Sequence, residues 1–208
     1  SDAAVYRGGG RMNEAGEIGG RTREGMEASI LQTALLGTAR GLLGDAVRTM
    51  LVRHAPVLGE EYTAWCDALL EGQTIRVRHP AARGVFVHPL DVVCCGLTLG
   101  ARAFRCGEGG VYNIGTDERS VCTRQSAARR LAMRHGGAGT AQEETEDGEP
   151  PAQLLDGSAA RRLCGAACRL DVDQALDLLL EQRRAARAGQ EEAAIRRMTR
   201  TYLEGCRA

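Results

Sequence analysis

The spacing of apolar residues predicts several helices along the chain. Between residues 24 and 43 apolar side chains recur close to every third or fourth position, which is the period of an amphipathic helix. The same reasoning predicts helices over residues 60–70 and 191–203. Residues 159–164 and 172–184 are also typical of helices. These segments account for most of the expected helical structure.

Short apolar or alternating runs between these segments predict strands. Residues 47–58 are typical of a buried strand that Pro56 interrupts and Gly59 ends. Shorter candidates follow at residues 75–77, 85–87 and 111–114. Because strands alternate with helices along the sequence, the expected fold class is α/β.

Two polar side chains are predicted to begin helices. The Asp91 carboxylate can accept hydrogen bonds from free backbone N–H groups, so we expect it to cap a helix that continues to Ala103. Ser120 is the expected cap of a helix that runs to about Arg134 and ends before Gly136.

One change of composition divides the chain. Residues 136–151, GGAGTAQEETEDGEPP, combine glycine, proline and acidic side chains that cannot bury much apolar surface. We therefore expect a mobile surface loop there, including a solvated run from Glu143 to Glu149. It separates residues 1–135, in which strands alternate with helices, from a helical part at residues 152–208.

Composition and charge exclude some classes of function. The 208 residues carry 27 basic and 27 acidic side chains, so net charge gives no reason to expect nucleic-acid binding. Aromatic residues make up only 3%, which argues against stacking platforms for single-stranded nucleic acid. No apolar run approaches the roughly 18 residues of a transmembrane helix. Every basic residue except the histidines is arginine, because the sequence contains no lysine.

The eight cysteines favour a reducing compartment, either the cytoplasm or the mitochondrion. They show no paired CxxC spacing and are accompanied by only four histidines, so no metal site is expected. Most lie in apolar segments, where buried reduced thiols are the simplest interpretation. Cys164 and Cys168 would lie a turn apart on a helix and could form a redox pair or bind a metal, although core packing is the preferred interpretation.

Four segments carry a family resemblance when taken together. They are MLVRHAPVLGE at residues 50–60, FVHPLDVV at 86–93, VYNIGTDERSV at 111–121 and PPAQLLDGSAARRLCG at 150–165. Their order and spacing resemble the second half of the extended short-chain dehydrogenases/reductases, the NAD-dependent epimerase/dehydratase family that includes dTDP-4-dehydrorhamnose reductases. The resemblance implies a partial or degenerate Rossmann-like fold with its substrate-binding part.

The resemblance also indicates what the sequence lacks. Family members begin with a glycine-rich turn that holds the cofactor pyrophosphate at a helix N-terminus. No such turn follows a strand near the start of this sequence, since the glycines at 8–10 do not open an apolar helix. The first half of the fold is therefore expected to be absent from these 208 residues.

The catalytic positions of the family fall on unsuitable residues. SDAAVYRGG resembles the strand that supplies a catalytic hydroxyl, and the alignment places Asp2 at that position. The family's Tyr-x-x-x-Lys pair falls on Gly19 and Arg23. A glycine has no proton to exchange with substrate, so acid/base catalysis is not expected. Tyr6 and Tyr62 are the nearest other phenols, and neither has a lysine partner.

Cofactor and substrate contacts follow from the same resemblance. Arg23 and Pro56 are the candidate cofactor contacts, and NAD(P) binding is expected to be weak or absent. The candidate substrate contacts are Arg53, Arg83, His88 and Asn113. For His88 and Asn113, a role in the fold itself is the preferred interpretation.

Two alternatives stay open for four arginines of this region. They either cluster on the diphosphate of a nucleotide sugar, which suits the paired donors of a guanidinium, or line a solvated strand face. These arginines are Arg53, Arg76, Arg78 and Arg83.

Two functions are compatible with these observations. The first is a pseudoenzyme that acts as a structural or regulatory subunit of a larger complex, such as a mitochondrial one, or of a homo-oligomer. The second is an active NAD(P)-dependent nucleotide-sugar epimerase, dehydratase or reductase of which these residues form only a part. The last predicted helix either docks on a protein partner or closes the domain's own core.

Overall fold

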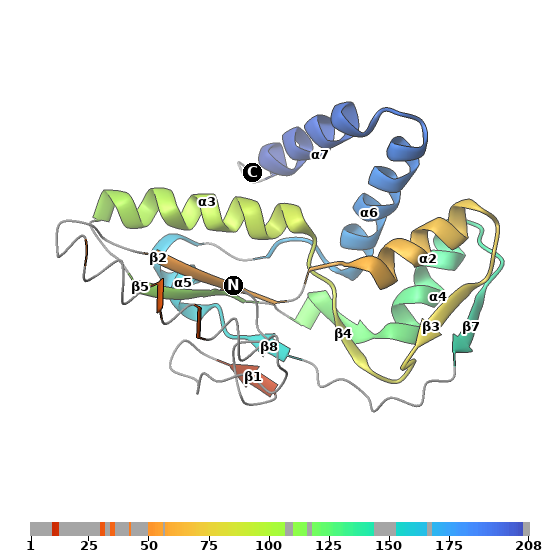
Figure 1. Cartoon of the computed structure of the whole chain (residues 1–208), viewed down its shortest axis with the longest axis horizontal. Helices are drawn as coiled ribbons and strands as arrows, with labels where there is room; N and C mark the ends of the chain where they lie inside the picture. The colour runs from red at the N-terminus through yellow and green to blue at the C-terminus, as the bar shows by residue number, and fades with distance from the viewer. Residues whose placement is uncertain are drawn as a thin grey trace. The chain divides into compact units, whose positions relative to one another are not determined.

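The computed structural model describes residues 10–12, 30–31, 34–35, 42, 50–55, 57–106, 110–115, 118–143, 153–165 and 168–205. The chain forms two compact units, each built from several segments (Figure 1). Unit 1 comprises residues 1–56, 91–117 and 151–169, and unit 2 comprises residues 57–90, 118–150 and 170–208. The domain boundaries expected from composition stay a prediction.

The described residues of unit 1 include two parallel strand pairs. Strand β2 (Met50–His54) pairs with β5 (Gly110–Ile114), and β1 (Gly10–Met12) pairs with β8 (Gln153–Leu155). The sequence predicted β2 and β5 but neither β1 nor β8. Both missed strands have only three residues, too few for a periodic pattern to be recognised.

Helices α3 and α5 also contribute to unit 1. Most of helix α3 (Pro89–Cys106) belongs to this unit, and it buries Asp91, Cys95, Leu99 and Ala103, which are spaced four residues apart. Helix α5 (Ser158–Cys164) ends at Gly165, whose φ of 69° is in the left-handed region. Of the stretch predicted as an early helix, the described residues 30, 31, 34, 35 and 42 are helical.

The described part of unit 2 combines two strand pairs with helices. Strand β3 (Ile75–Arg78) pairs in parallel with β7 (Thr140–Glu143), and β4 (Arg83–Val85) pairs antiparallel with β6 (Val121–Thr123). A 3₁₀ turn, η3 (Glu118–Ser120), precedes β6. The helices are α2 (Glu60–Leu70), α4 (Arg124–Arg134), α6 (Val172–Arg187) and α7 (Glu191–Gly205).

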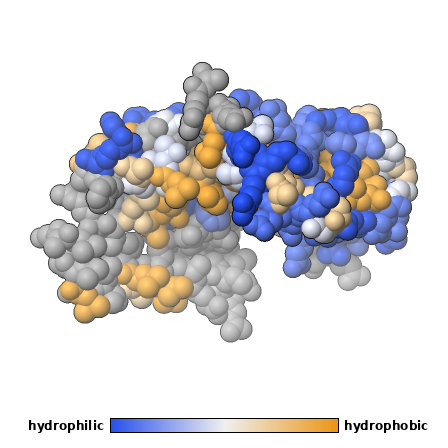
Figure 2. All heavy atoms as spheres, turned by 90° about the horizontal axis from the view of Figure 1, so that it is seen from above, coloured by the Kyte–Doolittle hydropathy of each residue, from blue (hydrophilic) through white to orange (hydrophobic). Residues whose placement is uncertain are grey.

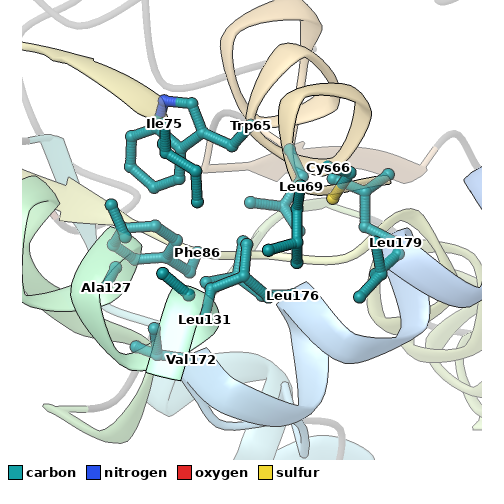
Figure 3. Close-up of a cluster of buried hydrophobic side chains, with 14 of the residues drawn as sticks. Trp65, Cys66, Leu69, Ile75, Phe86, Ala127, Leu131, Val172, Leu176 and Leu179 are labelled. Atoms are coloured by element: carbon teal, nitrogen blue, oxygen red, sulfur yellow. The ribbon is translucent and has the colours of Figure 1, made fainter. Parts of the chain in front are cut away.

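The hydrophobic core of unit 2 joins α2, α4 and α6 to the strands. Figure 3 shows Trp65 of α2 in one cluster with Phe86, Leu131 of α4 and Leu176 of α6. Tyr62 and Trp65 meet edge to face with ring centroids 5.0 Å apart, and the rings of Tyr62 and Phe86 are 5.1 Å apart. Such aromatic pairs stabilise a core beyond the area that they bury. Three predicted helices therefore supply one core.

Helix α7 buries only part of its apolar face. Its Ala194, Met198 and Tyr202 are buried, and the helix packs on α6. Ile195 and Leu203 of the same helix stay exposed. Packing against α6 accounts for part of the apolar face of α7, and docking on a protein partner stays a prediction. On the face seen in Figure 2, the described residues include both hydrophilic areas and places where apolar residues gather.

The two predicted helix caps were wrong. Helix α3 begins at Pro89, so Asp91 lies within its first turn and does not begin the helix. Helix α4 begins after Thr123, whose hydroxyl accepts from the Ser126 N–H, because residues 121–123 form strand β6. The Ser120 hydroxyl instead donates to the Leu170 carbonyl at 3.1 Å.

A predicted loop and a predicted cysteine pair also differ from expectation. Residues 140–143 of the expected mobile loop form β7, because β3 offers them a partner strand with matching backbone hydrogen bonds. Cys164 and Cys168 do not share a helix, since α5 ends at Cys164 and Gly165 reverses the backbone. Residues 144–152 of the loop lie outside the described residues.

Candidate functional site

Two predicted substrate contacts lie side by side in unit 1. Arg53 of β2 is the register partner of Asn113 of β5, and the two residues have exposed fractions of 1% and 0%. Register partners on adjacent strands project from the same face of a sheet. Both residues come one position before the carboxyl ends of their parallel strands, the edge at which α/β sheets bind ligands.

A buried carboxylate belongs to the same unit. Asp91 is fully buried in the first turn of α3, and its Oδ1 accepts from the backbone N–H of Arg169 at 2.9 Å. Buried polar groups need such partners, since an unpaired one costs about 1–3 kcal/mol. The bond attaches the chain at residues 168–169 to the beginning of α3. Asp91 thus has a structural role that periodicity alone did not reveal.

The end of β5 meets the turn before α5 at two glycines. A Cβ atom on Gly115 would lie 2.2 Å from the Gly157 nitrogen, and one on Gly157 would lie 2.4 Å from the Gly115 nitrogen. No side chain fits at such separations. The sequence motifs NIG and LDG therefore contain glycine because two backbones cross there, and Gly115 follows the strand that carries Asn113.

The other two predicted contacts lie in unit 2. His88 is buried, with an exposed fraction of 2%, whereas Arg83 at the beginning of β4 is exposed. The His88 Nδ1 accepts from the Leu90 N–H at 3.2 Å, so His88 caps the first turn of α3 in place of Asp91. Its Nε2 is buried and has no hydrogen-bond partner among the described residues. Burial lowers the pKa of His88 from 6.5 to about 4, so the imidazole is neutral near neutral pH.

The proposed arginine cluster divides between the two units. Arg76, Arg78 and Arg83 are exposed on unit 2, whereas Arg53 is buried in unit 1. Arg78 pairs with Glu143 of β7 at 3.2 Å, which fits a solvated strand face. The ion pair accounts for Arg78, whereas both alternatives stay open for Arg76 and Arg83.

An acidic residue of α2 also pairs with an arginine. Arg124 of α4 lies 2.9 Å from the Glu61 carboxylate, so the pair joins two helices of the unit 2 core. Burial raises the pKa of Glu61 despite the nearby cations. The packing of α2 and α4 in one core therefore explains why Glu61 and Arg124 are paired.

Other reactive groups of unit 2 are held in un-ionised forms. Burial raises the pKa of Tyr62 to about 12 and that of the Cys66 thiol to about 12. Burial also raises the pKa of Cys122, although Arg130 donates a hydrogen bond to its sulfur at 3.2 Å. A phenol or thiol with a raised pKa is a poor general base or nucleophile at neutral pH. The Tyr62 phenol is therefore poorly suited to proton transfer.

Four predicted site residues, Asp2, Gly19, Arg23 and Pro56, lie outside the described residues. Within the described ranges, no three His, Cys, Asp or Glu side chains form a group that could hold a metal ion. Likewise, no helix in the described part of the chain is long and apolar enough to cross a bilayer.

The cysteines only partly follow the expectation of burial. Cys66, Cys95 and Cys168 are buried, Cys94 and Cys122 are intermediate, and Cys106 is exposed at the end of α3.

Comparison with solved structures reveals a shared fold. The dTDP-glucose 4,6-dehydratase of Bacillus anthracis, solved with NAD, superposes with a TM-score of 0.71 at 14% identity, over 93% of this chain and 63% of its own. The UDP-glucose 4-epimerase of Bifidobacterium longum, solved with NAD⁺ and UDP, gives 0.70 at 18% identity, over 92% and 63%. MoeE5, solved with UDP-glucuronic acid and NAD, gives 0.70 at 23% identity, over 89% and 64%.

These likenesses establish the fold and its extent. The chain has the Rossmann-like fold of NAD-dependent epimerases and dehydratases of the extended short-chain dehydrogenase/reductase type, as its sequence motifs predicted. It spans 58 to 64% of the length of the three solved structures above and of a UDP-glucuronic acid 4-epimerase from Bacillus cereus. No family model matches the sequence, and no curated protein sequence matches it either.

Proposed function

We propose that this chain is a non-catalytic relative of the NAD-dependent epimerases and dehydratases that acts as a structural or regulatory subunit of a larger assembly. The observation that carries the proposal is the absence of lysine from the sequence, which leaves no Tyr-x-x-x-Lys pair within it. In the resembling enzymes this pair moves the proton that accompanies hydride transfer. Gly19 and Arg23 occupy its aligned positions.

The protonation states of the described residues support this proposal. His88 stays neutral, and the Tyr62 phenol and Cys66 thiol stay protonated, because loss of solvent around each group disfavours its charged form. Tyr62 has a packing role through its ring contacts, and His88 has a capping role through its hydrogen bond. These three groups are therefore poor substitutes for a phenol and ammonium pair.

Substrate-side architecture is the part that we propose the chain retains. Arg53 and Asn113 are the proposed substrate-facing polar groups of unit 1, and Arg83 and His88 are separate candidate substrate contacts of unit 2. A guanidinium presents two parallel donors that suit a diphosphate, and an amide can donate and accept. Nucleotide-sugar binding is better preserved than NAD(P) binding in this proposal, because the candidate cofactor contacts are reduced to Arg23 and Pro56.

The proposed compartment is a reducing one, the cytoplasm or the mitochondrion. The eight cysteines support it, because their spacing shows no disulfide framework. A larger assembly in either compartment would suit a subunit that has no chemistry of its own.

Calorimetry and enzyme assay on the purified protein test this function. We expect no nicotinamide absorbance change and no interconversion of UDP-glucose when NAD⁺ is supplied, and weak or no heat of NAD⁺ binding. The native mass should exceed the 22.2 kDa of this chain, because a subunit is expected in an assembly. Robust turnover of a nucleotide sugar by the protein would refute the proposal.

An active NAD(P)-dependent enzyme is the second candidate. The solved structures of similar fold favour it, since those named above were determined with NAD. Under this hypothesis the polypeptide that contains these residues also contains a glycine-rich cofactor turn and a Tyr-x-x-x-Lys pair. Sequencing of the native polypeptide by mass spectrometry distinguishes the two candidates, because only the enzyme requires both motifs.

A further inference from the structure

Two cysteines of unit 1 lie on segments that one hydrogen bond holds together. The Asp91 carboxylate on α3 accepts from the Arg169 N–H at 2.9 Å. Cys95 follows Asp91 by four residues on the buried face of α3, and Cys168 directly precedes Arg169. Cβ atoms four residues apart on a helix are about 5–6 Å from one another, and consecutive Cα atoms are about 3.8 Å apart. Cys95 and Cys168 are therefore each separated by a short stretch of chain from the same hydrogen bond.

Burial restricts the two thiols further. The exposed fractions of Cys95 and Cys168 are 4% and 3%, so both side chains face the interior. Cys94 and Cys106 of the same helix are less buried. A disulfide requires Cα atoms about 4.4–6.8 Å apart, so the proposed bond requires the two segments to reach that separation. A metal site is disfavoured, because the described residues supply no group of three suitable ligands.

The location of the pair gives such a bond a consequence. The chain passes between the two units at Leu90–Asp91 and again at Arg169–Leu170. Asp91 and Arg169 are the unit 1 residues at these two crossings, and their hydrogen bond already joins them. A covalent bond beside it would fix their separation.

We propose that Cys95 and Cys168 form a redox-sensitive pair that closes to a disulfide and locks the beginning of α3 to the segment that ends at Arg169. The oxidant is hydrogen peroxide, which is small enough to reach a buried thiol during local opening. One thiolate attacks a peroxide oxygen, the O–O bond breaks, and a sulfenic acid forms with release of water. The second sulfur attacks the sulfenic sulfur, the S–S bond forms, and a second water leaves. Two thiols are oxidised and one peroxide is reduced.

Peptide mapping of the oxidised protein tests the pair. Trypsin releases Cys95 in peptide 84–102 together with Cys94, and Cys168 in peptide 163–169 together with Cys164. Cys94→Ala and Cys164→Ala are therefore combined, so that the only thiols in these peptides are those of the proposed pair. After peroxide treatment we expect the two peptides to be cross-linked, and reduction by dithiothreitol to separate them.

Matched variants and an internal control decide the outcome. Adding Cys95→Ala or Cys168→Ala to that background should lower the cross-linked species at least tenfold. The exposed Cys106 should form a dimedone-reactive sulfenic acid in every variant, which verifies that the oxidant acted. A missing cross-link despite Cys106 oxidation would overturn the proposal.

A stability measurement provides a second readout that does not depend on peptide recovery. The thermal midpoint of the Cys94→Ala/Cys164→Ala protein should rise on oxidation and return on reduction, because a cross-link restricts the unfolded chain. With Cys168→Ala added, oxidation should cause no rise. An equal rise in both proteins would contradict the assignment of the bond to Cys95 and Cys168.

Discussion

Gly115 and Gly157 cross so closely that a Cβ atom on Gly115 would lie 2.2 Å from the nitrogen of Gly157. The crossing joins the end of β5 to the turn that opens α5, within unit 1. Neither glycine has a positive φ, so the requirement for glycine comes from space and not from backbone conformation. Each of the two segments must therefore have a residue without a side chain where they cross.

Replacing Gly115 with alanine should destabilise unit 1. The added methyl group would overlap the Gly157 backbone, and relief requires the two segments to separate. Overpacking of this kind costs about 1–3 kcal/mol, so the free energy of unfolding should fall by about that much. Urea denaturation monitored by circular dichroism measures the change.

Gly96→Ala is the matched control for that substitution. Gly96 lies inside α3, and nothing lies within 4 Å of the position that its Cβ would occupy. Alanine is favoured over glycine in helices by about 1 kcal/mol, so this variant should be as stable as the wild type or more stable. If Gly115→Ala matched Gly96→Ala in stability, the close crossing would be disproved.

Phe86→Ala should strongly destabilise unit 2. Phe86 is fully buried and contacts the Tyr62 ring in the core. Truncation of a buried aromatic residue costs about 3–5 kcal/mol, because it removes apolar contacts and leaves a cavity. Met133→Ala is the control, since Met133 is 76% exposed and its loss should change stability by less than about 0.5 kcal/mol. Thermal and urea unfolding of both variants measure the difference, and similar losses would argue against this core.

Acid should destabilise the protein through His88. Its pKa falls from 6.5 to about 4 on folding, so the unfolded chain binds a proton between these values and the folded chain does not. Above pH 6.5 His88 is neutral in both the folded and the unfolded chain, so its burial then carries no protonation penalty. The free energy of unfolding decreases as the pH falls from 6.5 toward 4. At about 1.36 kcal/mol per pKa unit, the total loss is about 3 kcal/mol.

His88→Asn isolates this titration from all others. Asparagine can still accept a hydrogen bond at the helix start but does not titrate. Urea midpoints measured between about pH 7.5 and about pH 4.5 should depend less on pH in the variant than in the wild type. An unchanged slope would show that His88 does not account for the acid sensitivity.

Asp67→Asn should weaken the attachment of α2 to α6. Arg183 donates to both Asp67 oxygens, at 3.1 and 2.8 Å, and Arg187 donates to Asp67 at 3.1 Å. Burial acts to raise the pKa of Asp67, but the two guanidinium groups outweigh it and lower the pKa from its ordinary value. The ion pairs stabilise the protein fully at a pH above the pKa that Asp67 has in the unfolded chain. This stabilisation is lost as the pH falls through the lower pKa that Asp67 has in the folded chain. We expect a loss of about 1 kcal/mol at neutral pH, because the pair is partly solvated.

Glu192→Gln is the control for this ion pair. Glu192 pairs with Arg196 on α7, but their side chains are 80% and 77% exposed, so removing the charge should have almost no effect. Chemical denaturation at low and high salt compares the two variants. Equal effects of Asp67→Asn and Glu192→Gln would indicate that the α2–α6 pair adds nothing beyond an ordinary surface contact.

The sequence predicted the elements with long periodic patterns. Helices α2, α6 and α7 lie close to the expected ranges, since their apolar residues repeat at the helical period over many positions. Strands β2 and β5 were also predicted, and the four quoted motifs indicated the fold that the structural comparison confirmed. Strands β1 and β8 were missed because three residues are too few for a recognisable pattern, and β7 was missed because it lies in a stretch whose composition predicted a loop.

The candidate site was predicted less completely. Sequence reasoning selected Arg53, His88 and Asn113, all of which proved to be buried polar residues. It did not reveal that Arg53 and Asn113 are register partners, nor that His88 caps α3. The Pro89 that follows His88 was a signal for that cap, since proline is favoured in the first turn of a helix.

The sequence by itself shows that the chain contains no lysine, and it determines the spacing of apolar residues within each helix and strand. Both are properties of the chain that no packing arrangement can alter. Only the tertiary structure decided which residues meet: the Gly115 and Gly157 crossing, the Asp91 bond to Arg169, and the division of the arginines between two units. The physical reason is that periodicity reports which side of an element faces the interior, whereas contacts between distant segments depend on how those interiors pack.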